Sequence, residues 1–437
     1  MNELFLNRMK HMLGDEYDAY LQSLNQPAKR GIRINVLKRE ASAIEGICEE
    51  RSPFCANGWY ISPECPVGSL PEYFAGHIYP QEPSASFAVT AMDVRPGMKI
   101  LDLCAAPGSK STQIAECLNN EGLLVANEIH PGRAAILKEN LERHGCANAV
   151  VVNSSPSQVA ALFSEYFDAV LCDAPCSGEG MFRKDPDAIL HWSYEHVASC
   201  AVRQAAILDD AAACLKPGGV LIYSTCTFSE EEDEDTVRSF LERHPEFHPD
   251  PIMHKGGRSV LNEISSADFA RRIYPMDQGE GHFVARMRKQ KDDSVPERPI
   301  KLLKSEPVPS ECIRFLKEHG CDRFPYLYFH KNVLYGGTSP FIDVSPLHLI
   351  RHQTVLGTIK NNRFEPAHAL ALSSLAGMCP IAELNEEELQ SYRHGDTIQR
   401  GIEKGWAAAA YKGMRIGLVK SDGRMLKNHY PKAFRVR

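Results

Sequence analysis

Residues 99–227 alternate short apolar segments with longer amphipathic ones, and this alternation limits the possible folds more than any other feature of the chain. The expected strands are residues 99–106, 122–129, 149–155, 167–176 and 218–227, and the expected helices are residues 109–120, 131–145 and 194–215. Strands and helices that alternate at this spacing predict an α/β fold with a Rossmann-like, doubly wound parallel sheet. Ligands of such sheets bind at the carboxyl ends of the strands.

The flanking segments divide the chain into five predicted regions. Residues 1–75 predict a small α+β module, residues 76–288 the doubly wound domain, and residues 289–310 a charged, proline-containing linker. Residues 311–385 predict a second α+β region, and residues 386–437, with short apolar segments joined by glycine turns, a small β-rich module. With 437 residues and 43% hydrophobic content, the chain can build more than one core.

The composition argues against membrane, disulfide and metal chemistry. No apolar run approaches the roughly 18 residues that a membrane span needs, so we expect no membrane partner. The fourteen cysteines are scattered through apolar segments without a secretion signal, which predicts a reduced, cytoplasmic protein. Cys172 and Cys176 have three residues between them, and no second pair of Cys or His follows at ligand spacing, so we expect no metal.

Charge is distributed unevenly along the chain. The net charge is −7, but residues 391–437 carry eleven Lys or Arg against three acids, a local balance of +8 that leaves −15 on the rest. A basic C-terminal region on an acidic body indicates an anionic partner such as a nucleic acid. The alternative interpretation is a solvated basic face.

Residues 101–111 (LDLCAAPGSKS) end a predicted strand in a glycine turn before a helix. Backbone amides at a helix start suit the negative end of a ligand, and Gly108 allows close approach to the main chain. The segment is neither G-x-G-x-x-G nor a Walker motif, which disfavours nucleoside triphosphates. Glu128 ends the second strand, where doubly wound folds bind the ribose of adenosine-containing ligands. Taken alone, Glu128 could equally be a solvated acid.

A carboxylate and two thiols follow the fourth and fifth predicted strands. Asp173 and Cys176 belong to the motif DAPC, in which Pro175 stiffens the turn, and Cys226 follows the next strand fifty residues later. If these two strands are neighbours in the sheet, both thiols face one cleft. A lone cysteine that closes an apolar strand is most often buried and inert, so the interpretation of Cys226 depends on these neighbours.

This combination fits a reaction in which thiol addition makes a carbon atom nucleophilic. Carbon 5 of cytosine becomes enamine-like when a thiolate adds at carbon 6, and it can then attack an activated methyl group. A carboxylate near N3 and N4 would hold the ring, and a base must remove the C5 proton before the thiol leaves. The residue types alone do not show which cysteine attacks.

Four segments carry a specific resemblance to a known family. They are LDLCAAPGSKSTQIAE, DAPCSGEGMFRKDPDA, LKPGGVLIYSTCTFSEEEDE and RRIYPMDQGEGHFVA. They closely resemble the motifs of the NOL1/NOP2/Sun family of S-adenosylmethionine-dependent RNA 5-methylcytosine methyltransferases. The flanks RGIRINVLK and YRHGDTI through LKNHYPKAFRVR resemble the bacterial RsmF-type branch, which methylates 16S ribosomal RNA and ends in a PUA-like RNA-binding module.

The resemblance implies a role for each motif residue. Glu128 would hold the ribose of S-adenosylmethionine, and Asp173 would lie beside cofactor and target base. Cys226 would be the nucleophile, and Cys176 would assist proton removal or product release. The methionine side of the cofactor would be lined by Cys104, Ala105, Ala106, Pro107, Gly108, Ser109 and Lys110.

Two positions depart from the family pattern. Ser155 stands where the family usually has an acid near the adenine, so a hydroxyl or a backbone carbonyl would replace that contact. The family's Glu-Glu-Asn after the nucleophile is replaced by the acidic run 230–235, which we expect to begin a helix.

The resemblance also implies the partners. We expect a monomer that acts on ribosomal RNA or the small ribosomal subunit, not on DNA, and that flips its target cytosine out of the stack. The alternatives are a transfer-RNA cytosine-5 methyltransferase and a non-catalytic ribosome-assembly factor that binds RNA.

Overall fold

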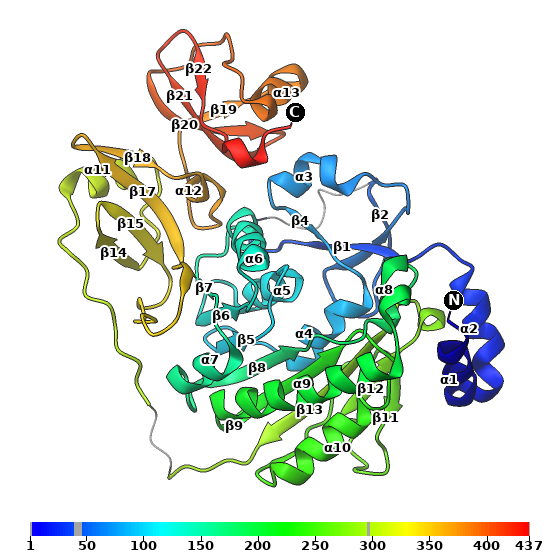
Figure 1. Cartoon of the computed structure of the whole chain (residues 1–437). Helices are drawn as coiled ribbons and strands as arrows, with labels where there is room; N and C mark the ends of the chain where they lie inside the picture. Colours follow the sequence, from blue (N-terminus) through cyan, green and yellow to red (C-terminus); the bar gives the residue numbers. More distant parts are fainter. Residues whose placement is uncertain (1, 39–45, 295–297, 437) are drawn as a thin grey trace.

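The computed structural model of the chain describes residues 2–38, 46–294 and 298–436, and these contain four β-sheets (Figure 1). The largest sheet has ten strands and contains all the strands expected from the alternating pattern. Its parallel part consists of β5 (Lys99–Asp102), β6 (Leu123–Asn127), β7 (Ala149–Val152), β8 (Phe167–Asp173) and β9 (Leu215–Thr225). Their order in space is β9-β8-β5-β6-β7, so the chain starts in the middle of the sheet and winds outward in both directions.

Antiparallel strands extend this sheet at both edges. Beyond β9 lie β13 (His282–Lys289), β12 (Ala270–Ile273) and β11 (Arg258–Val260), and β10 (Phe247–Pro249) also pairs with β13. Beyond β7 lies β16 (Leu349–Arg351), which the chain contributes from its C-terminal half. The expected doubly wound α/β fold is confirmed, with an antiparallel extension that the apolar pattern did not indicate.

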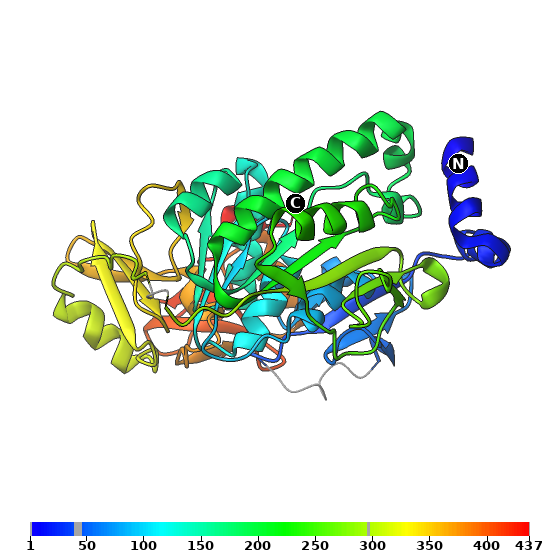
Figure 2. The ribbon, with the colours of Figure 1, turned by 90° about the horizontal axis from the view of Figure 1, so that it is seen from below.

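Helices cover both faces of the sheet because successive strand residues point to opposite sides. Leu101 and Val170 join the core under α7 (Pro156–Leu162), α9 (Tyr194–Cys214) and α10 (Glu234–Arg243). Ile100 and Leu171 join the core under α4 (Phe87–Met92), α5 (Ser109–Leu118) and α6 (Pro131–His144). Figure 2 shows the long green helix α9 along one face of the sheet.

The N-terminal part forms a second sheet and a helical hairpin. The sheet has the order β2-β3-β1-β4, with β1 (Arg30–Ile34), β2 (Cys48–Arg51), β3 (Gly58–Ile61) and β4 (Ile78–Pro80). Helices α1 (Glu3–Leu13) and α2 (Tyr17–Leu24) pack on aromatic side chains of the large domain, Phe182 and Phe228 among them. The short helices α3 (Pro71–Phe74) and α8 (Pro186–His191) complete this side of the molecule.

The C-terminal part holds the two remaining sheets. The first contains β14 (Tyr326–His330), β15 (Val333–Gly337), β17 (Thr354–Lys360) and β18 (Arg363–Pro366), flanked by α11 (Ser310–Glu318) and α12 (His368–Leu372). The second contains β19 (Ile381–Glu383), β20 (Gly405–Tyr411), β21 (Met414–Ser421) and β22 (Leu426–Asn428), with α13 (Glu386–His394). The end of the expected linker is docked, since Leu303 N donates to Phe341 O (2.8 Å) and Glu306 N to Phe329 O (3.0 Å).

Neither a membrane-spanning helix nor a metal-binding cluster is present in the described residues 2–38, 46–294 and 298–436. None of their helices is long and apolar enough to cross a membrane. Within the same part of the chain, no group of three or more His, Cys, Asp or Glu side chains could hold a metal ion.

A buried arginine joins the N-terminal sheet to the large domain. Arg33 in β1 is 1% exposed, and its Nε donates to Glu116 Oε2 in α5 (2.8 Å). The remaining nitrogens donate to Thr112 Oγ1 (2.6 Å), the Ser109 carbonyl (3.0 Å) and Gln81 Oε1. Burial disfavours the charged guanidinium, but Glu116 outweighs this effect and raises the pKa of Arg33. The arginine therefore stays charged and ties β1 to the start of α5.

We predict that Arg33→Met lowers the free energy of unfolding by about 3–5 kcal/mol, because Glu116 would stay buried without its cation. Urea denaturation followed by circular dichroism measures this change. Arg95→Met is the matched control, since Arg95 is 75% exposed and pairs with Asp93 at the surface, where ion pairs contribute little. Equal urea midpoints for Arg33→Met and the wild type would contradict the prediction.

Candidate active site

Two sulfur atoms lie side by side at the ends of adjacent parallel strands. β8 pairs with β9 so that Asp173 is opposite Ser224, and each strand runs directly into its cysteine-containing loop. The distance from Cys176 Sγ to Cys226 Sγ is 3.2 Å, and Cys226 N lies 3.4 Å from Cys176 Sγ. Both side chains are half-buried. The expectation that these two strands are neighbours is confirmed, and their ends bring the two sulfurs together.

Hydrogen bonds from distant parts of the chain hold the two cysteine loops together. Glu232 Oε2 accepts from Ser177 N (2.9 Å) and from Gln204 Nε2 (2.8 Å). Gly180 N donates to Cys226 O (2.9 Å), which fixes the loop after Cys176 against the end of β9. The thiols are thus placed by backbone contacts as well as by the sheet.

The acidic run after Cys226 requires a correction. We expected residues 230–235 to begin a helix, but α10 begins at Glu234, and only Glu234 and Asp235 lie in its first turn. Glu232 and Asp233 precede the helix with no exposed surface. Thr225 Oγ1 donates to Asp233 Oδ1 (2.6 Å), and Arg272 Nη2 to Asp233 Oδ2 (2.8 Å). These two carboxylates support the site from inside rather than favouring a helix end.

The surroundings of Cys176 favour its protonated form. The hydrogen bond with Cys226 and burial together raise the pKa of the Cys176 thiol well above its ordinary value. Cys176 therefore keeps its proton at neutral pH, and its S–H can donate a hydrogen bond to the neighbouring sulfur. Burial likewise raises the pKa of Cys104 in the preceding loop, which leaves that thiol protonated and unreactive.

Asp173 lies beside the thiols within a small charged cluster. Its Oδ2 accepts from Lys110 Nζ (2.9 Å), and its Oδ1 accepts from Ser224 Oγ (2.7 Å). Burial alone would raise the pKa of Asp173, but the charge of Lys110 and these hydrogen bonds lower it below its ordinary value. Asp173 is 30% exposed, so it can meet a ligand as an ionised carboxylate.

A neutral imidazole completes this cluster. His282, the first residue of β13, has Nε2 3.9 Å from Asp173 Oδ1. Burial, with the charge of Lys110, lowers the pKa of His282 to about 4, so the ring is neutral at physiological pH. Among the described residues, Nε2 has no hydrogen-bond partner.

The loop of residues 104–110 runs from β5 to α5 with its carbonyl groups anchored. Arg133 Nη2 donates to the Ala106 carbonyl (2.7 Å) and Asn140 Nδ2 to the Pro107 carbonyl (2.7 Å). Gly108 has φ of 111°, and a Cβ there would lie 3.0 Å from Leu137 Cδ1. Backbone conformation and packing on α6 therefore require this glycine, independently of any ligand.

The carboxylate expected at the second strand lies immediately after β6. Glu128 is 3% exposed, its Oε1 accepts from His130 N (2.9 Å), and its Oε2 lies 3.5 Å from Arg133 Nη1.

A second buried carboxylate, Asp102, ends β5. Ser111 Oγ donates to Asp102 Oδ2 (2.6 Å), whereas Asp102 Oδ1 is buried without a partner among the described residues. Burial, with the nearby charge of Asp173, raises the pKa of Asp102 to about 7.

Ser155 is the N-cap of α7. Its Oγ accepts from Gln158 N (3.3 Å), and its own N–H donates to Gln158 Oε1 (3.0 Å), which is a complete capping box. The local fold accounts for a serine at this position, and its contact with an adenine stays a prediction.

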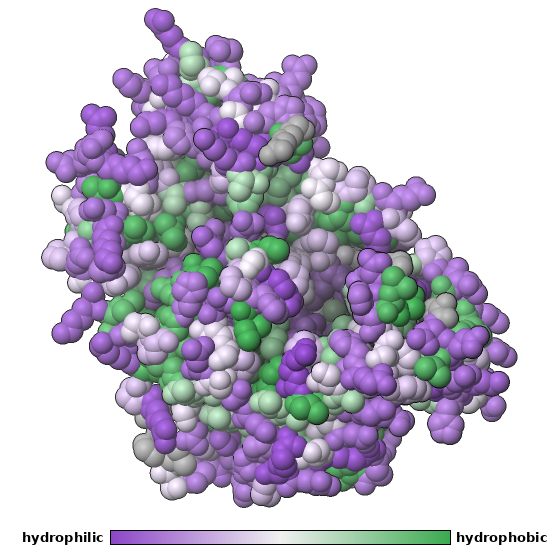
Figure 3. Space-filling view, viewed as in Figure 1, coloured by the Kyte–Doolittle hydropathy of each residue, from purple (hydrophilic) through white to green (hydrophobic). Residues whose placement is uncertain are grey.

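The carboxylates of Glu128 and Asp102 offer hydrogen-bond acceptors of the kind that S-adenosylmethionine requires. A carboxylate at the second strand end suits ribose hydroxyls, and an unpaired buried oxygen of Asp102 remains near the loop of residues 104–110. Figure 3 shows this face of the molecule hollowed between the regions of α5 and α8.

Known protein families and relatives match this sequence over nearly its whole length. The family model for 16S rRNA methyltransferase RsmB/F matches residues 89–288. Models for the N-terminal, first C-terminal and PUA domains of RsmF match residues 1–83, 314–373 and 379–436. Ribosomal RNA small subunit methyltransferase F of Cronobacter sakazakii is 31% identical, covering 98% of this chain and 95% of the relative. The protein of the same name from Vibrio vulnificus is 31% identical over 98% and 96%.

Solved structures show the same fold. A methyltransferase homolog protein from Pyrococcus horikoshii, 29% identical, matches with a TM-score of 0.59 over 66% of this chain and 95% of that one. NSun6 from Pyrococcus horikoshii with SFG, 23% identical, matches in fold with a TM-score of 0.58 over 67% and 99%.

The protein is an S-adenosylmethionine-dependent methyltransferase. Its doubly wound sheet, with these carboxylates and thiols at the strand ends, and its similarity to known methyltransferases define this class. Within that class the similarity extends over nearly the whole chain, and the chain belongs to the RsmF family. The expected resemblance to the bacterial RsmF-type branch is thereby confirmed.

We predict that diamide joins Cys176 and Cys226 in a disulfide, because their sulfurs lie 3.2 Å apart and a disulfide needs about 2.05 Å. Diamide accepts the two hydrogen atoms that the thiols lose. Non-reducing peptide mass spectrometry should find the two peptides linked, and dithiothreitol should separate them. Cys226→Ser is the control without a link; wild-type protein whose Cys176 stays alkylatable after diamide would show that the sulfurs are not adjacent.

We predict that Lys110→Met makes methyl transfer sensitive to mild acid. In the wild type the pKa of Asp173 lies below its ordinary value, so the carboxylate is ionised throughout the pH range of the assay. Without Lys110, burial dominates and raises that pKa, so Asp173 takes up a proton as the pH falls from neutral. The measurement is kcat/KM between pH 5 and pH 8, and Lys138→Met, at a surface position of α6, should keep the wild-type profile. An unchanged profile for Lys110→Met would refute this role of the ion pair.

Proposed function

We propose that this protein methylates carbon 5 of a cytosine in small-subunit ribosomal RNA through a transient bond between Cys226 and carbon 6 of the base. The relatives named above are small-subunit ribosomal RNA methyltransferases and span the whole chain, which supports the substrate. The observation that carries the chemistry is the pair of sulfurs 3.2 Å apart beside an ionised Asp173.

Each residue of the site has a task in this reaction. S-adenosylmethionine, when bound, supplies the electrophilic methyl group. Cys226 adds to carbon 6, and Asp173, held by Lys110 and Ser224, faces the N3 and N4 edge of the base. Carbon 5 then becomes nucleophilic and gains the methyl group. Solvent water then takes the C5 proton, and the electrons of the broken C5–H bond re-form the C5–C6 double bond as the bond between carbon 6 and Cys226 breaks, which restores the aromatic ring.

The second thiol serves the last step in this proposal. Cys176 keeps its proton because its pKa is raised by the hydrogen bond with Cys226 and by burial. Its sulfur lies 3.2 Å from the sulfur that must leave, so its S–H can donate a hydrogen bond that stabilises the departing Cys226 thiolate. The distance between the sulfurs is the same for both residues, so the assignment of attack to Cys226 and release to Cys176 rests on the resemblance of their motifs to those of the family.

RNA binding would come from the basic C-terminal segment. Residues 391–437 carry the local charge of +8, and most of them belong to the matched PUA domain. Lys and Arg there would contact the phosphate backbone while the target cytosine is flipped into the site. All the site residues come from one chain, so the proposal needs no partner copy.

We predict that Cys226→Ala abolishes methylation and forms no covalent RNA adduct, whereas Cys176→Ala attacks but releases its product slowly. Small ribosomal subunits and their protein-free RNA are incubated with labelled S-adenosylmethionine, and denaturing gels then reveal protein bound to RNA. Wild-type enzyme should transfer label to cytosine carbon 5, identified by nuclease digestion and mass spectrometry.

Cys200→Ala is a matched control, because Cys200 is a buried cysteine of α9 outside the thiol pair, and it should leave methylation near the wild-type rate. An adduct in Cys226→Ala and none in Cys176→Ala would exchange the two roles. Absence of label from both RNA substrates with wild-type enzyme would overturn the proposed function.

A further inference from the structure

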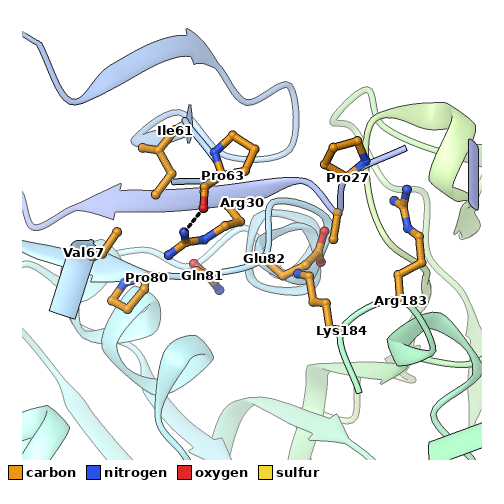
Figure 4. Close-up of a pocket in the computed structure, with 12 residues that line it drawn as sticks. Pro27, Arg30, Ile61, Pro63, Val67, Pro80, Gln81, Glu82, Arg183 and Lys184 are labelled. Atoms are coloured by element: carbon orange, nitrogen blue, oxygen red, sulfur yellow. Dashed lines mark hydrogen bonds between the residues drawn. The ribbon is translucent and has the colours of Figure 1, made fainter. Parts of the chain in front are cut away.

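A cavity of about 460 Å³ lies between the N-terminal sheet and the loop that follows Cys176 (Figure 4). Arg30, Ile61 and Val67 line it from the N-terminal module, and Lys184 lines it from the large domain. Pockets that hold small ligands commonly measure about 300–1,000 Å³, so a nucleotide fits this volume. None of the roles proposed above for the catalytic residues uses this cavity.

Three cations line this cavity, and two of them, Arg30 and Lys184, lack an acidic partner among the described residues. Arg183 is neutralised by Glu280, to which Nε and Nη2 donate at 2.8 Å each. Arg30, in contrast, donates to the Pro63 carbonyl, and among the described residues neither Arg30 nor Lys184 has a carboxylate within 4.0 Å. In Figure 4 the side chains of Arg30 and Lys184 extend along the cavity from opposite walls.

The carboxylate that also lines the cavity has its oxygens occupied. Glu82 Oε1 accepts from Ser84 N (3.0 Å) and Glu280 N (3.1 Å), and Oε2 accepts from Ser84 Oγ (2.6 Å) and Ala85 N (2.7 Å). Burial still lowers the pKa of Lys184 despite the charges of Glu82 and Glu280. An anion that enters between Arg30 and Lys184 would therefore find free donors.

Two short segments connect the walls of the cavity to the catalytic residues. Lys184 follows the 3-10 turn Glu179–Met181, whose Gly180 N donates to the carbonyl of Cys226. On the other side, Glu280 N donates to Glu82, and Glu280 is two residues before His282, the neighbour of Asp173. A strand of RNA whose cytosine occupies the catalytic cleft would pass this cavity.

We propose that the cavity holds the nucleotide next to the target cytosine, with its phosphate between Arg30 and Lys184. The inference rests on the proposed function and extends it to the neighbouring position of the RNA. Apolar atoms of Ile61, Pro63 and Val67 face the base, and the amide of Gln81 is already bonded to Arg33 and Gln113. The cavity therefore fixes the path of the strand and places little demand on the identity of the base.

The test compares Lys184→Gln and Arg30→Gln with Lys304→Gln, a change at an exposed position outside the cavity. Affinity for a short single-stranded oligocytidine RNA is measured by fluorescence anisotropy at several salt concentrations. Each cavity variant should reduce the slope of log K against log salt by about 0.7, the value for one lost phosphate contact on a single strand. Methylation of protein-free small-subunit RNA should show KM raised about tenfold, as for the loss of one charged hydrogen bond.

Salt dependence, KM and S-adenosylmethionine binding together distinguish a failure of this inference from a failure of the proposed function. Unchanged slope and KM in both cavity variants, with S-adenosylmethionine binding intact by calorimetry, would overturn the inference while leaving the proposed function in place. An equal loss of slope in Lys304→Gln would also overturn it, because the effect would then be one of overall charge. If the wild type methylates no RNA, the proposed function fails first.

Discussion

The parallel pairing of β8 with β9 determines the geometry of the site. The pairing sets Asp173 opposite Ser224, and the two cysteine loops begin directly beyond this pair. A slip by one residue would turn every side chain of one strand to the other face of the sheet. Both faces of these strands are buried, with Val170 and Leu221 in one core and Leu171 and Ile222 in the other. The register of these two strands thus sets the distance between the two sulfurs.

The sequence predicted the parallel part of the sheet and the adjacency of the thiols, because continuous apolar runs and strand-end motifs are local signals. It did not predict β12 and β13, because those strands contain buried arginines. Arg272 is 3% exposed and is paired with Asp233 and Glu234, while Arg286 is 7% exposed and bonded to Asp250. A charged residue interrupts an apolar pattern, and only its distant partner makes it compatible with burial.

The same limit applies to the candidate site. Cys226, Cys176, Asp173 and Lys110 are recognisable in their motifs, but the contacts that orient them join residues far apart in the chain. An acidic run is usually solvated, so nothing local marks Glu232 as a buried acceptor for Ser177 N. Ser224 and His282 likewise acquire their place beside Asp173 through the order of the strands.

The buried Arg33 extends this dependence to the N-terminal module. Its guanidinium bonds to the Ser109 carbonyl, in the segment that we propose for the cofactor, and to Gln81 beside the cavity that we assign to RNA. Neither segment can shift against β1 without breaking hydrogen bonds to a buried charge, a loss of several kcal/mol. Methyl transfer requires the methyl group and the receiving carbon in near-contact, and small displacements slow such reactions greatly. One arginine thus holds the surface proposed for RNA and the loop proposed for the cofactor in a fixed relation.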